Sequence, residues 1–497
     1  MKRLSISIFL FLFCGVLNLY SQRIDSVWPI GYDCCGFTYF GAMNLTFTGA
    51  TMNLSSVQRH QNFSETVGSA CDSANNLLFT TNGIYVANAS DDTMQNGSGL
   101  NPSYYTSQNL RDGLTLPQGN LVLPSLTDSN QFILFHNTID DYLNTGATYF
   151  LYTTTIDMNQ NGGLGAVINK NTIFFTDTLT PGRIVATRHA NGRDWWITAR
   201  KLRSNTLFEF LYTPFGILGP FQQHLPLLRE FNAGQSAFNP QGTKYAYFES
   251  FKGLELTDFN RCTGLLSNQI QCEINDSSVY GVGACFSPNG RFLYITTVDH
   301  LYQYDMWATN IDSSRILIGI YDGFIDTVTS NVTHFWLEAL GPDGKIYIST
   351  SSSTPYLHVI NYPDSIGGAC GFCQHCISLP YLNAFTMPNF PNYYLGAETG
   401  SVCDSLGVGI HEVKSEMEFN IYPNPAAEKV NFHYSKLSSK AILLIYNLTG
   451  EVVSTYLLKR NESEITIDLS HFAEGVYTCK LTDGNNFVVK RMVVMHQ

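Results

Sequence analysis

The sequence predicts an all-β protein in which a β-propeller is followed by a small C-terminal β-sandwich. Three observations predict this fold class: a turn-and-strand phrase that recurs at nearly even spacing, a composition rich in strand and turn residues, and a separate strand pattern after residue 418. From them we expect a signal peptide at 1–21, the propeller at 24–402, a linker at 403–418 and the sandwich at 419–497.

The recurring phrase is a proline- and glycine-containing turn followed by an alternating strand. Its three clearest copies are Asn239–Gly242, Ser287–Gly290 and Gly341–Gly344, whose prolines are spaced 48 and 54 residues apart. Each block matches a type I turn, because proline at the second position has its φ already set and glycine at the fourth tolerates the exit conformation. A strand precedes and follows each turn, so each copy predicts a β-hairpin.

Weaker copies of the hairpin lie upstream, at Cys71–Asn88, Leu123–Thr138 and Arg188–Arg200. A hairpin that recurs roughly every 50 residues is typical of propeller blades. Radial packing buries the flat faces that a lone blade would leave open. We therefore expect six to eight blades and favour seven. Stacked sandwich domains are the alternative, but they would not require so regular a period.

The overall composition agrees with an exported β protein. Charged residues make up 14% of the chain and the net charge is −12. An acidic surface repels phosphate backbones, so nucleic acid is not an expected partner. Lys2 and Arg3 precede the apolar stretch Leu4–Leu17, and Ser21-Gln22 offers a cleavage point, which is the pattern of a signal peptide. No later segment is long and apolar enough to predict a transmembrane helix.

Export makes disulfides the expected state of most of the 12 cysteines. Cys262 and Cys272 flank a short loop and are the best candidate pair. The stretch "CGFCQHC" (Cys370–Cys376) could also bind zinc or form a redox dithiol together with His375. It lacks the second, distant ligand pair of a zinc ribbon, so we favour disulfides there. Cys479 lies in an alternating strand, which predicts a small buried side chain.

The tail carries the motifs of a known family. The residues that match it are Tyr422, Pro423, Asn424, Pro425, Gly450, Gly475, Tyr477 and Lys490. The pattern from Phe419 to Val494 resembles the type A C-terminal sorting domain of the type IX secretion system. The resemblance implies export with that secretion machinery as a partner, and release or attachment at the outer cell surface. An immunoglobulin-like domain without a targeting role is the alternative.

The propeller region also resembles a family. The stretches "CDSANNLLFTTNGIYVAN", "RHANGRDWWI" and "LGPDGKIYIST" are similar to the N-terminal propeller of gliding-associated and PKD-containing surface proteins that use the same export route. No PKD domain is visible in this sequence. The resemblance implies a secreted or surface-attached propeller joined directly to its sorting tag.

One polar and aromatic cluster is a candidate binding patch. It comprises His189, Arg193, Asp194 and Trp195, with Trp196 next to them. Tryptophan and arginine make strong contact residues in binding sites. The competing interpretation is blade packing, with one tryptophan between sheets and the other stacked under Arg193. We favour packing because buried aromatic residues dominate β cores.

The sequence shows no signature of catalysis. It contains no His-Glu-x-x-His zinc motif, no Gly-x-Ser-x-Gly elbow and no Asp-rich calcium loop, so we expect no catalytic residue, metal or cofactor. The expected function is therefore non-enzymatic recognition of a glycan or a protein partner. The alternative is a secreted polysaccharide hydrolase, whose two carboxyl groups could lie far apart in sequence. Converging carboxyl groups with perturbed acidity in the channel would favour the hydrolase, and amide, hydroxyl and aromatic side chains would favour binding.

Overall fold

The protein is described by a computed structural model. It covers 24–33, 37–225, 234–249, 253–274, 281–404, 419–435, 441–447, 452–459, 462–482 and 487–496. The chain forms two compact units, one before and one after residue 405, and each has its own hydrophobic core. The expected signal peptide lies outside the described residues.

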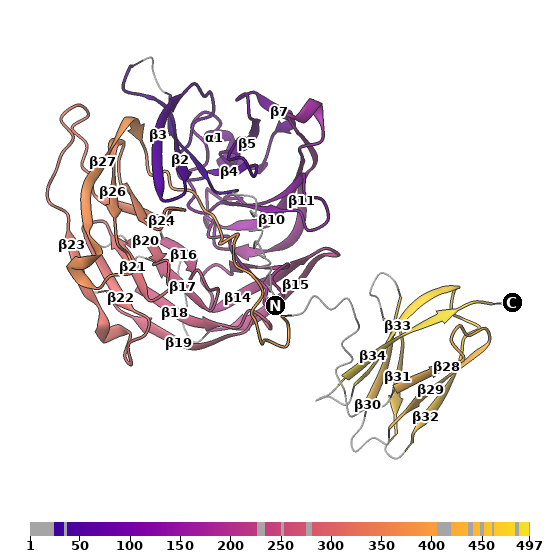
Figure 1. The fold of residues 1–497 in the computed structure, drawn as a ribbon. Helices are drawn as coiled ribbons and strands as arrows, with labels where there is room; N and C mark the ends of the chain where they lie inside the picture. Colours follow the sequence, from indigo (N-terminus) through magenta and orange to yellow (C-terminus); the bar gives the residue numbers. More distant parts are fainter. Residues whose placement is uncertain are drawn as a thin grey trace, which may run out of the picture. The chain divides into compact units, whose positions relative to one another are not determined.

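The first unit is a β-propeller, whose sheets stand around a common axis (Figure 1). Blade 1 has three strands, and blades 2 and 3 are linked into one eight-stranded sheet where Ala166 pairs with Gln95. The strands of these three blades are β1 (Val27–Tyr32), β2 (Gly41–Thr48), β3 (Thr51–Val57), β4 (Gly68–Cys71), β5 (Leu77–Thr81), β6 (Tyr85–Asn88), β7 (Thr93–Ser98), β8 (Asn120–Pro124), β9 (Gln131–His136), β10 (Thr148–Asp157) and β11 (Ala166–Leu179).

Four further sheets of four antiparallel strands complete seven blades in the described part of this unit. Their strands are β12 (Val185–Arg188), β13 (Trp195–Arg200), β14 (Thr206–Thr213), β15 (Gly216–His224), β16 (Gly234–Phe238), β17 (Lys244–Glu249), β18 (Gly253–Phe259), β19 (Leu266–Cys272), β20 (Gly281–Phe286), β21 (Phe292–Thr297), β22 (His300–Asp305), β23 (Ile316–Ile320), β24 (Phe335–Leu340), β25 (Ile346–Thr350), β26 (Thr354–Ile360) and β27 (Phe372–Asn383). First strands of neighbouring blades contact one another, as β16 and β20 do, and β20 and β24.

Helical segments in the described residues are short and lie in connections between strands. They are α1 (Tyr104–Gln108), which Ser103 caps, and the 3-10 segments Asn161–Gly163, Asp312–Ser314 and Gly367–Cys370. The prediction of an all-β chain is therefore confirmed.

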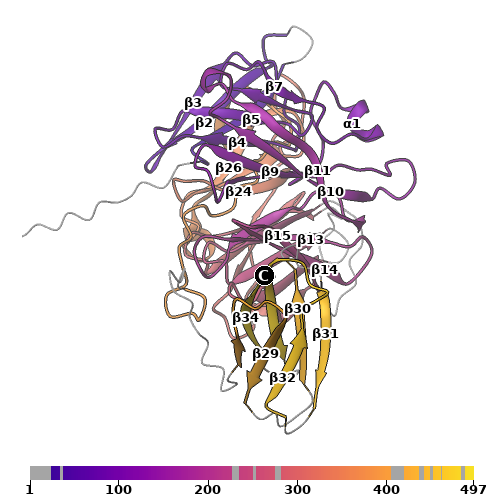
Figure 2. The ribbon, with the colours of Figure 1, turned by 90° about the vertical axis from the view of Figure 1, so that its right-hand side faces the viewer.

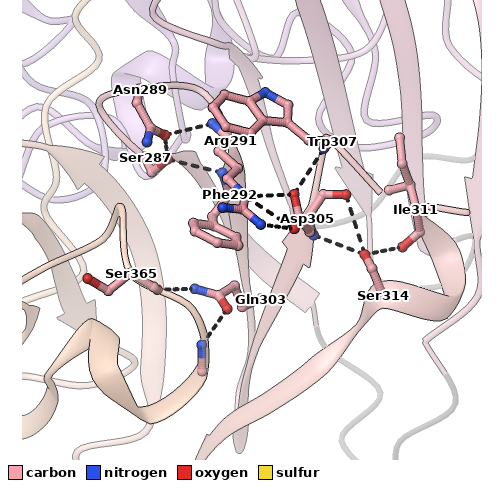
Figure 3. A network of polar contacts seen from close by, with 11 residues as sticks. Ser287, Asn289, Arg291, Phe292, Gln303, Asp305, Trp307, Ile311, Ser314 and Ser365 are labelled. Carbon is pink, nitrogen blue, oxygen red and sulfur yellow. Dashed lines mark hydrogen bonds and ion pairs between the residues drawn. The ribbon is translucent and has the colours of Figure 1, made fainter. Parts of the chain in front are cut away.

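The recurring phrase forms the turn between the first and second strands of blade 5 (β16–β19), blade 6 (β20–β23) and blade 7 (β24–β27). In each copy the glycine N–H donates to the carbonyl oxygen of the first turn residue, at 2.8, 2.9 and 2.9 Å. In blade 6, Ser287 and Asn289 also accept hydrogen bonds from the backbone N–H groups of Phe292 and Arg291, and the Arg291 side chain pairs with Asp305 at 2.8 Å (Figure 3). Turn residues that satisfy their own backbone fix the register of the strands that follow.

Apolar faces between neighbouring blades form the propeller core. Between blades 6 and 7, for example, Tyr294, Phe335 and Ile346 have 0% exposure. Burying one such side chain contributes roughly 1.5–3 kcal/mol. Polar ties cross the same boundary: Gln303 Nε2 donates to the Ser365 carbonyl at 2.8 Å (Figure 3). The blades therefore stabilise one another, which explains why the hairpins repeat.

An axial segment, Ala384–Tyr394, follows the last strand and runs through the centre of the ring (Figure 1). Thr386 donates its hydroxyl to the Phe63 and Ser64 carbonyls, which precede β4. Asn389 Nδ2 donates to the Asn120 carbonyl in β8, and Asn392 Nδ2 donates to the Pro240 carbonyl in the turn after β16, both at 2.8 Å. The segment therefore passes from one face of the propeller to the other.

The second unit is a β-sandwich of two sheets (Figure 2). Its strands are β28 (Phe419–Tyr422), β29 (Lys429–Tyr434), β30 (Ala441–Tyr446), β31 (Val452–Leu458), β32 (Glu464–Asp468), β33 (Gly475–Thr482) and β34 (Phe487–Val494). Inward side chains such as Phe432, Leu443 and Cys479 have 0% exposure and fill the space between the sheets. The small buried Cys479 is as the alternating pattern predicts.

Candidate functional site

A cavity of about 660 Å³ opens beside the axial segment. Its rim is built from the recurring turns: Asn239 and Pro240 of blade 5, Pro288 of blade 6, and Gly341–Gly344 of blade 7. Gln241 Nε2 donates to the Pro288 carbonyl at 3.3 Å and ties two of these turns together. The motif that predicts the fold therefore also forms the mouth of its central cavity.

The axial segment supplies one wall of this cavity. Asn389 Nδ2 donates to the carbonyls of Asn120 and Ile184, both at 2.8 Å, and so fastens the wall to β8 and to the residue before β12. Phe390 is half-buried against Trp28, with ring centroids 6.4 Å apart. Tyr394 is 48% exposed. The axial segment therefore contributes aromatic side chains to the cavity lining. Hydrogen bonds from Asn389 hold this segment in place.

Two glutamines brace the inner strands around the cavity. Gln118 Nε2 donates to the Ser236 carbonyl at 2.8 Å, and its Oε1 accepts from the Ser236 N–H at 2.9 Å. Gln235 donates to the Glu338 carbonyl at 2.7 Å and accepts from the N–H groups of Glu338 and Ala284. These amides are used by the fold, so they make the cavity walls rigid.

Glu338 is a buried carboxyl group at the cavity. The residue is 1% exposed, and its two carboxylate oxygens have no hydrogen-bond partner among the described residues. Its side chain fits because Gly283 has no Cβ: a Cβ there would lie 2.7 Å from Glu338 Cγ. Burial raises the pKa of Glu338 to about 8. The carboxyl group is therefore held mainly in its neutral form at neutral pH.

Two aspartates also line the cavity, and each is engaged by a tyrosine. Tyr394 donates its hydroxyl to Asp25 at 2.7 Å, and Tyr347 donates to Asp343 at 2.8 Å. These hydrogen bonds orient both carboxylates toward the walls. The lining thus combines proline and aromatic rings with a few fixed polar groups.

The predicted binding cluster lies in the turn between β12 and β13. Arg193 pairs with Asp194 at 2.6 Å, and His189 Nε2 is hydrogen-bonded to the Cys262 carbonyl at 3.0 Å. Trp195 is 0% exposed, which favours the packing interpretation for it, and its binding role stays a prediction. The group shares one turn but forms no open site around Trp195. A binding role for the partly exposed Arg193 stays a prediction.

The packing interpretation named the wrong arginine. Arg188, not Arg193, stacks on Trp195, with its guanidinium carbon 4.1 Å from the ring centroid. Arg188 and Trp195 are direct cross-strand partners, so their side chains lie on the same face of the sheet. Arg188 and Trp195 lie three positions before Asn191 and three after Gly192, so the hairpin turn in the sequence would have identified this pair.

The predicted Cys262–Cys272 disulfide is wrong. Cys262 bonds to Cys403, with Cα atoms 5.6 Å apart, and Cys272 is a buried free thiol. Cys262 lies in the turn before β19, whereas Cys272 ends that strand, and an extended strand of this length separates its ends by roughly 20 Å. The bond instead fastens the chain beyond the axial segment to blade 5.

The cysteine-rich stretch near residue 370 contains a disulfide, as favoured. Cys373 bonds to Cys376, while Cys370 is a buried free thiol. His375 does not join them as a metal ligand: its Nε2 lies 2.9 Å from Asp322 Oδ2. Within the described residues, no group of three or more His, Cys, Asp or Glu side chains is placed to hold a metal ion.

The tail motif residues connect the edges of the sandwich. Asn424 accepts a hydrogen bond from the Val493 N–H and donates to the Arg491 carbonyl, both at 2.8 Å. The remaining described motif contacts are Tyr422 to Glu464 at 2.8 Å, Tyr477 to the Ala473 carbonyl at 2.8 Å, and Lys490 to Asn420 at 3.0 Å. Pro423 and Pro425 flank Asn424, Gly475 opens β33, and Gly450 lies outside the described residues.

These contacts belong to a recognisable module. The family model described as the secretion system C-terminal sorting domain matches residues 420–495. Residues 420–495 are a sorting domain. The expectation of export by the type IX secretion system, to the cell surface or beyond it, is thereby confirmed. Among the described helices, none has the length and apolar character that a membrane crossing needs.

Solved structures that resemble the chain do so weakly. A Bacteroides fragilis NCTC 9343 protein named as a candidate 6-phosphogluconolactonase is 13% identical, with a TM-score of 0.39 over 72% of this chain and 97% of its own. The β-propeller domain of a Myceliophteria thermophila protein is 9% identical, with a TM-score of 0.34 over 63% and 88%. A Xanthomonas campestris gluconolactonase is 11% identical, with a TM-score of 0.33 over 66% and 97%.

No function is carried over from these structures. No curated protein matches the sequence. The resemblance of the propeller to gliding-associated and PKD-containing surface proteins stays a prediction.

Proposed function

We propose that this exported propeller is a non-enzymatic recognition protein that binds one or two sugar units of a glycan in the axial cavity. The observation that carries the proposal is the lining of the cavity. Half-buried Phe238 and Phe390 and the exposed ring of Tyr394 lie among proline rings and fixed polar groups. The C–H faces of sugars pack on the electron-rich faces of aromatic rings, while sugar hydroxyl groups form hydrogen bonds with polar groups nearby.

The size of the cavity favours a small ligand over a protein surface. About 660 Å³ falls within the range of small-molecule pockets. A stable protein interface needs about 800 Å² from each partner, which a cavity of this size does not offer. The proposal therefore chooses the glycan from the two partner classes that the sequence leaves open, and a protein ligand becomes an outcome of the test.

The carboxyl groups favour binding over hydrolysis. Glycoside hydrolysis commonly uses two carboxyl groups on either side of the scissile bond. At this cavity Glu338 is buried, while Asp25 and Asp343 are engaged by tyrosine hydroxyls. Glu338 is therefore withdrawn into the wall, and each aspartate already accepts a tyrosine hydroxyl, which supports binding.

The test is a glycan array probed with the full-length protein, followed by calorimetry on the bound glycans. We expect Tyr394→Ala and Phe390→Ala to weaken binding at least tenfold, because each removes an aromatic wall. Phe215→Ala is the matched control, since Phe215 is 93% exposed and does not line the cavity. Unchanged binding in the two wall variants, capture of proteins alone, or release of shortened glycans would each overturn the proposal.

A further inference from the structure

The Cys373–Cys376 disulfide lies on an open edge of the propeller. It belongs to β27, the last strand in the order β24-β25-β26-β27. Cys373 is half-buried and Cys376 is exposed. Thiol–disulfide exchange needs a thiolate to approach one sulfur atom, and the outer edge of a blade gives that access.

This disulfide adds less to the stability of the fold than Cys262–Cys403 does. Its cysteines are separated by 3 positions, whereas Cys262 and Cys403 are separated by 141. A disulfide stabilises mainly by restricting the unfolded chain, and the effect grows with the length of the closed loop. The strand is already held by pairing with β26, where Val359 lies opposite Cys373. Stabilisation of the fold therefore explains the presence of the Cys262–Cys403 disulfide well and that of Cys373–Cys376 poorly.

One of the two residues between the bonded cysteines, His375, has a costly backbone conformation. His375 has a φ of 40°, in the left-handed region that residues other than glycine avoid. Its N–H donates to His358 Nδ1 at 2.9 Å, and its ring stacks on Phe324 with centroids 4.1 Å apart. The closed Cys-x-x-Cys loop includes this residue, so opening the loop releases a constraint on it. That release favours the reduced form.

The other described thiols are poor competitors for exchange. The free cysteines Cys71, Cys272, Cys285, Cys370 and Cys479 are all buried. Burial raises the pKa of Cys71, Cys272 and Cys479 to about 12, which keeps these thiols protonated. Among the described cysteines, exchange therefore depends on the two disulfides, and Cys376 is the only one of their four cysteines that is exposed rather than half-buried.

We propose that Cys373–Cys376 is a redox-exchange site that oxidises thiols outside the cell. A substrate thiolate attacks Cys376 Sγ, a mixed disulfide forms, and Cys373 leaves as a thiolate that takes a proton from water. A second substrate thiolate then attacks the mixed disulfide, and Cys376 leaves in the same way. Two substrate thiols become one disulfide, and the protein disulfide gains two electrons and two protons. The proposal does not depend on the glycan site.

The test compares the two disulfides within one full-length protein. The protein is equilibrated in glutathione buffers of graded GSH²/GSSG ratio, quenched in acid, alkylated, and analysed by mass spectrometry. We expect Cys373–Cys376 to be half reduced at a ratio at least tenfold lower than Cys262–Cys403. An equal ratio, or a higher one for Cys373–Cys376, would overturn the proposal. This measurement needs no variant, so a folding defect cannot obscure it.

A second arm identifies the thiol source. Reduced, unfolded ribonuclease A supplies protein dithiols, and its disulfide gain is compared with the loss of Cys373–Cys376. Transfer from the ribonuclease supports protein dithiols as substrates, transfer from glutathione alone supports small thiols, and transfer from neither overturns the proposal. The Cys373→Ser/Cys376→Ser variant should oxidise neither thiol source.

Two variants at one position test the backbone argument. His375→Gly removes the cost of the left-handed conformation from the oxidised form, so we expect it to need at least a threefold higher GSH²/GSSG ratio for reduction. His375→Ala removes the ring and keeps the backbone cost, so its ratio should stay close to that of the native protein. Equal shifts in both variants would contradict the role assigned to the backbone.

Discussion

Asn389 Nδ2 donates a hydrogen bond to the Asn120 carbonyl at 2.8 Å, across 269 positions of sequence. The same nitrogen donates to Ile184, and Asn389 Oδ1 accepts from Gln118 Nε2 at 3.1 Å. One amide thus joins the axial segment to residues of blade 3 and to the entrance of blade 4. The propeller is held at its hub by a side chain from outside the blades.

We therefore expect Asn389→Leu to lower the free energy of unfolding of the propeller by about 2–4 kcal/mol, because it leaves buried partners without hydrogen bonds. Tryptophan fluorescence in a denaturant series measures this loss, since all 5 tryptophans precede residue 405 and report on the propeller alone. Asn144→Ala, in an exposed turn, is the control and should change stability by less than about 0.5 kcal/mol. Equal losses in both variants would contradict the role of the hub contact.

The two disulfides should differ in their effect on stability. Replacing Cys262 and Cys403 with serine removes a link across 141 positions, which the loop-entropy relation values at about 5 kcal/mol. Replacing Cys373 and Cys376 removes a link across 3 positions, valued at about 2 kcal/mol. Denaturant midpoints of the two double variants test the order. Protease cleavage within 395–404 should increase only in the first variant.

Glycines at the same position of the recurring turn should tolerate alanine differently. Gly242 and Gly344 both have positive φ, 68° and 80°, so alanine costs about 1–2 kcal/mol at each. At Gly242 the new Cβ would also collide with Thr187 Oγ1, whereas at Gly344 the nearest atom is Pro288 Cγ at 3.9 Å. We expect Gly242→Ala to lose about 3 kcal/mol or more and Gly344→Ala about half of that. Similar melting temperatures for the two variants would contradict this argument.

The sequence identifies those features that depend on local residues. The Pro/Gly turns at Asn239–Gly242 and its two later copies predict hairpins and a blade period, because turn chemistry and strand alternation are both local. The tail motif identifies the sorting domain for the same reason. These predictions are confirmed by the sheet topology and the family match.

The cavity and the long disulfide depend on contacts between distant parts of the chain. Nothing near Cys262 indicates that Cys403 is its partner, because the path of the axial segment brings them together. Asn389, Phe390 and Tyr394 look like an ordinary polar and aromatic loop until the ring surrounds them. Trp195 illustrates the opposite case, since a conspicuous residue type proved to be fully buried.

Buried glutamates should make the propeller less stable as the pH rises. Burial raises the pKa of Glu338 and Glu209 to about 8 and that of Glu65 to about 7, from an ordinary 4.5. Between these values the unfolded chain releases protons that the folded chain keeps, so the stabilising contribution is lost with increasing pH. Each group contributes a slope of at most about 1.4 kcal/mol per pH unit.

Two buried histidines have the opposite effect on stability at lower pH: they make the propeller less stable as the pH falls. Burial lowers the pKa of His136 and His358 to about 3, so their contribution is lost as the pH falls below about 6.5. Between about pH 6.5 and pH 8, therefore, the change of stability with pH reports on the buried glutamates and not on these two histidines. There we expect the melting temperature of the native protein to fall with pH, and that of Glu338→Gln to fall less. Parallel slopes for the two proteins would show that Glu338 is already ionised.

The sorting domain holds its motif in a turn that is fastened to β34. Asn424 binds the backbone of β34 through Arg491 and Val493, so Asn424→Ala detaches the turn from that strand. We expect a loss of about 1–2 kcal/mol in the sorting domain, measured by hydrogen exchange and mass spectrometry. Tyr422→Phe removes one exposed hydrogen bond, to Glu464, and should cost about 0.5 kcal/mol.

Measuring the secreted fraction distinguishes the effect of the motif geometry from the effect of the stability of the sorting domain. Ile467→Val trims the buried core of the same domain and should cost about 1 kcal/mol, close to the loss expected for Asn424→Ala. If the secretion machinery recognises the turn as it is fixed against β34, the secreted fraction should fall strongly for Asn424→Ala and little for Ile467→Val. Only Asn424→Ala alters the turn. An equal fall in the secreted fraction of the two variants would therefore mean that the machinery responds to the stability of the domain.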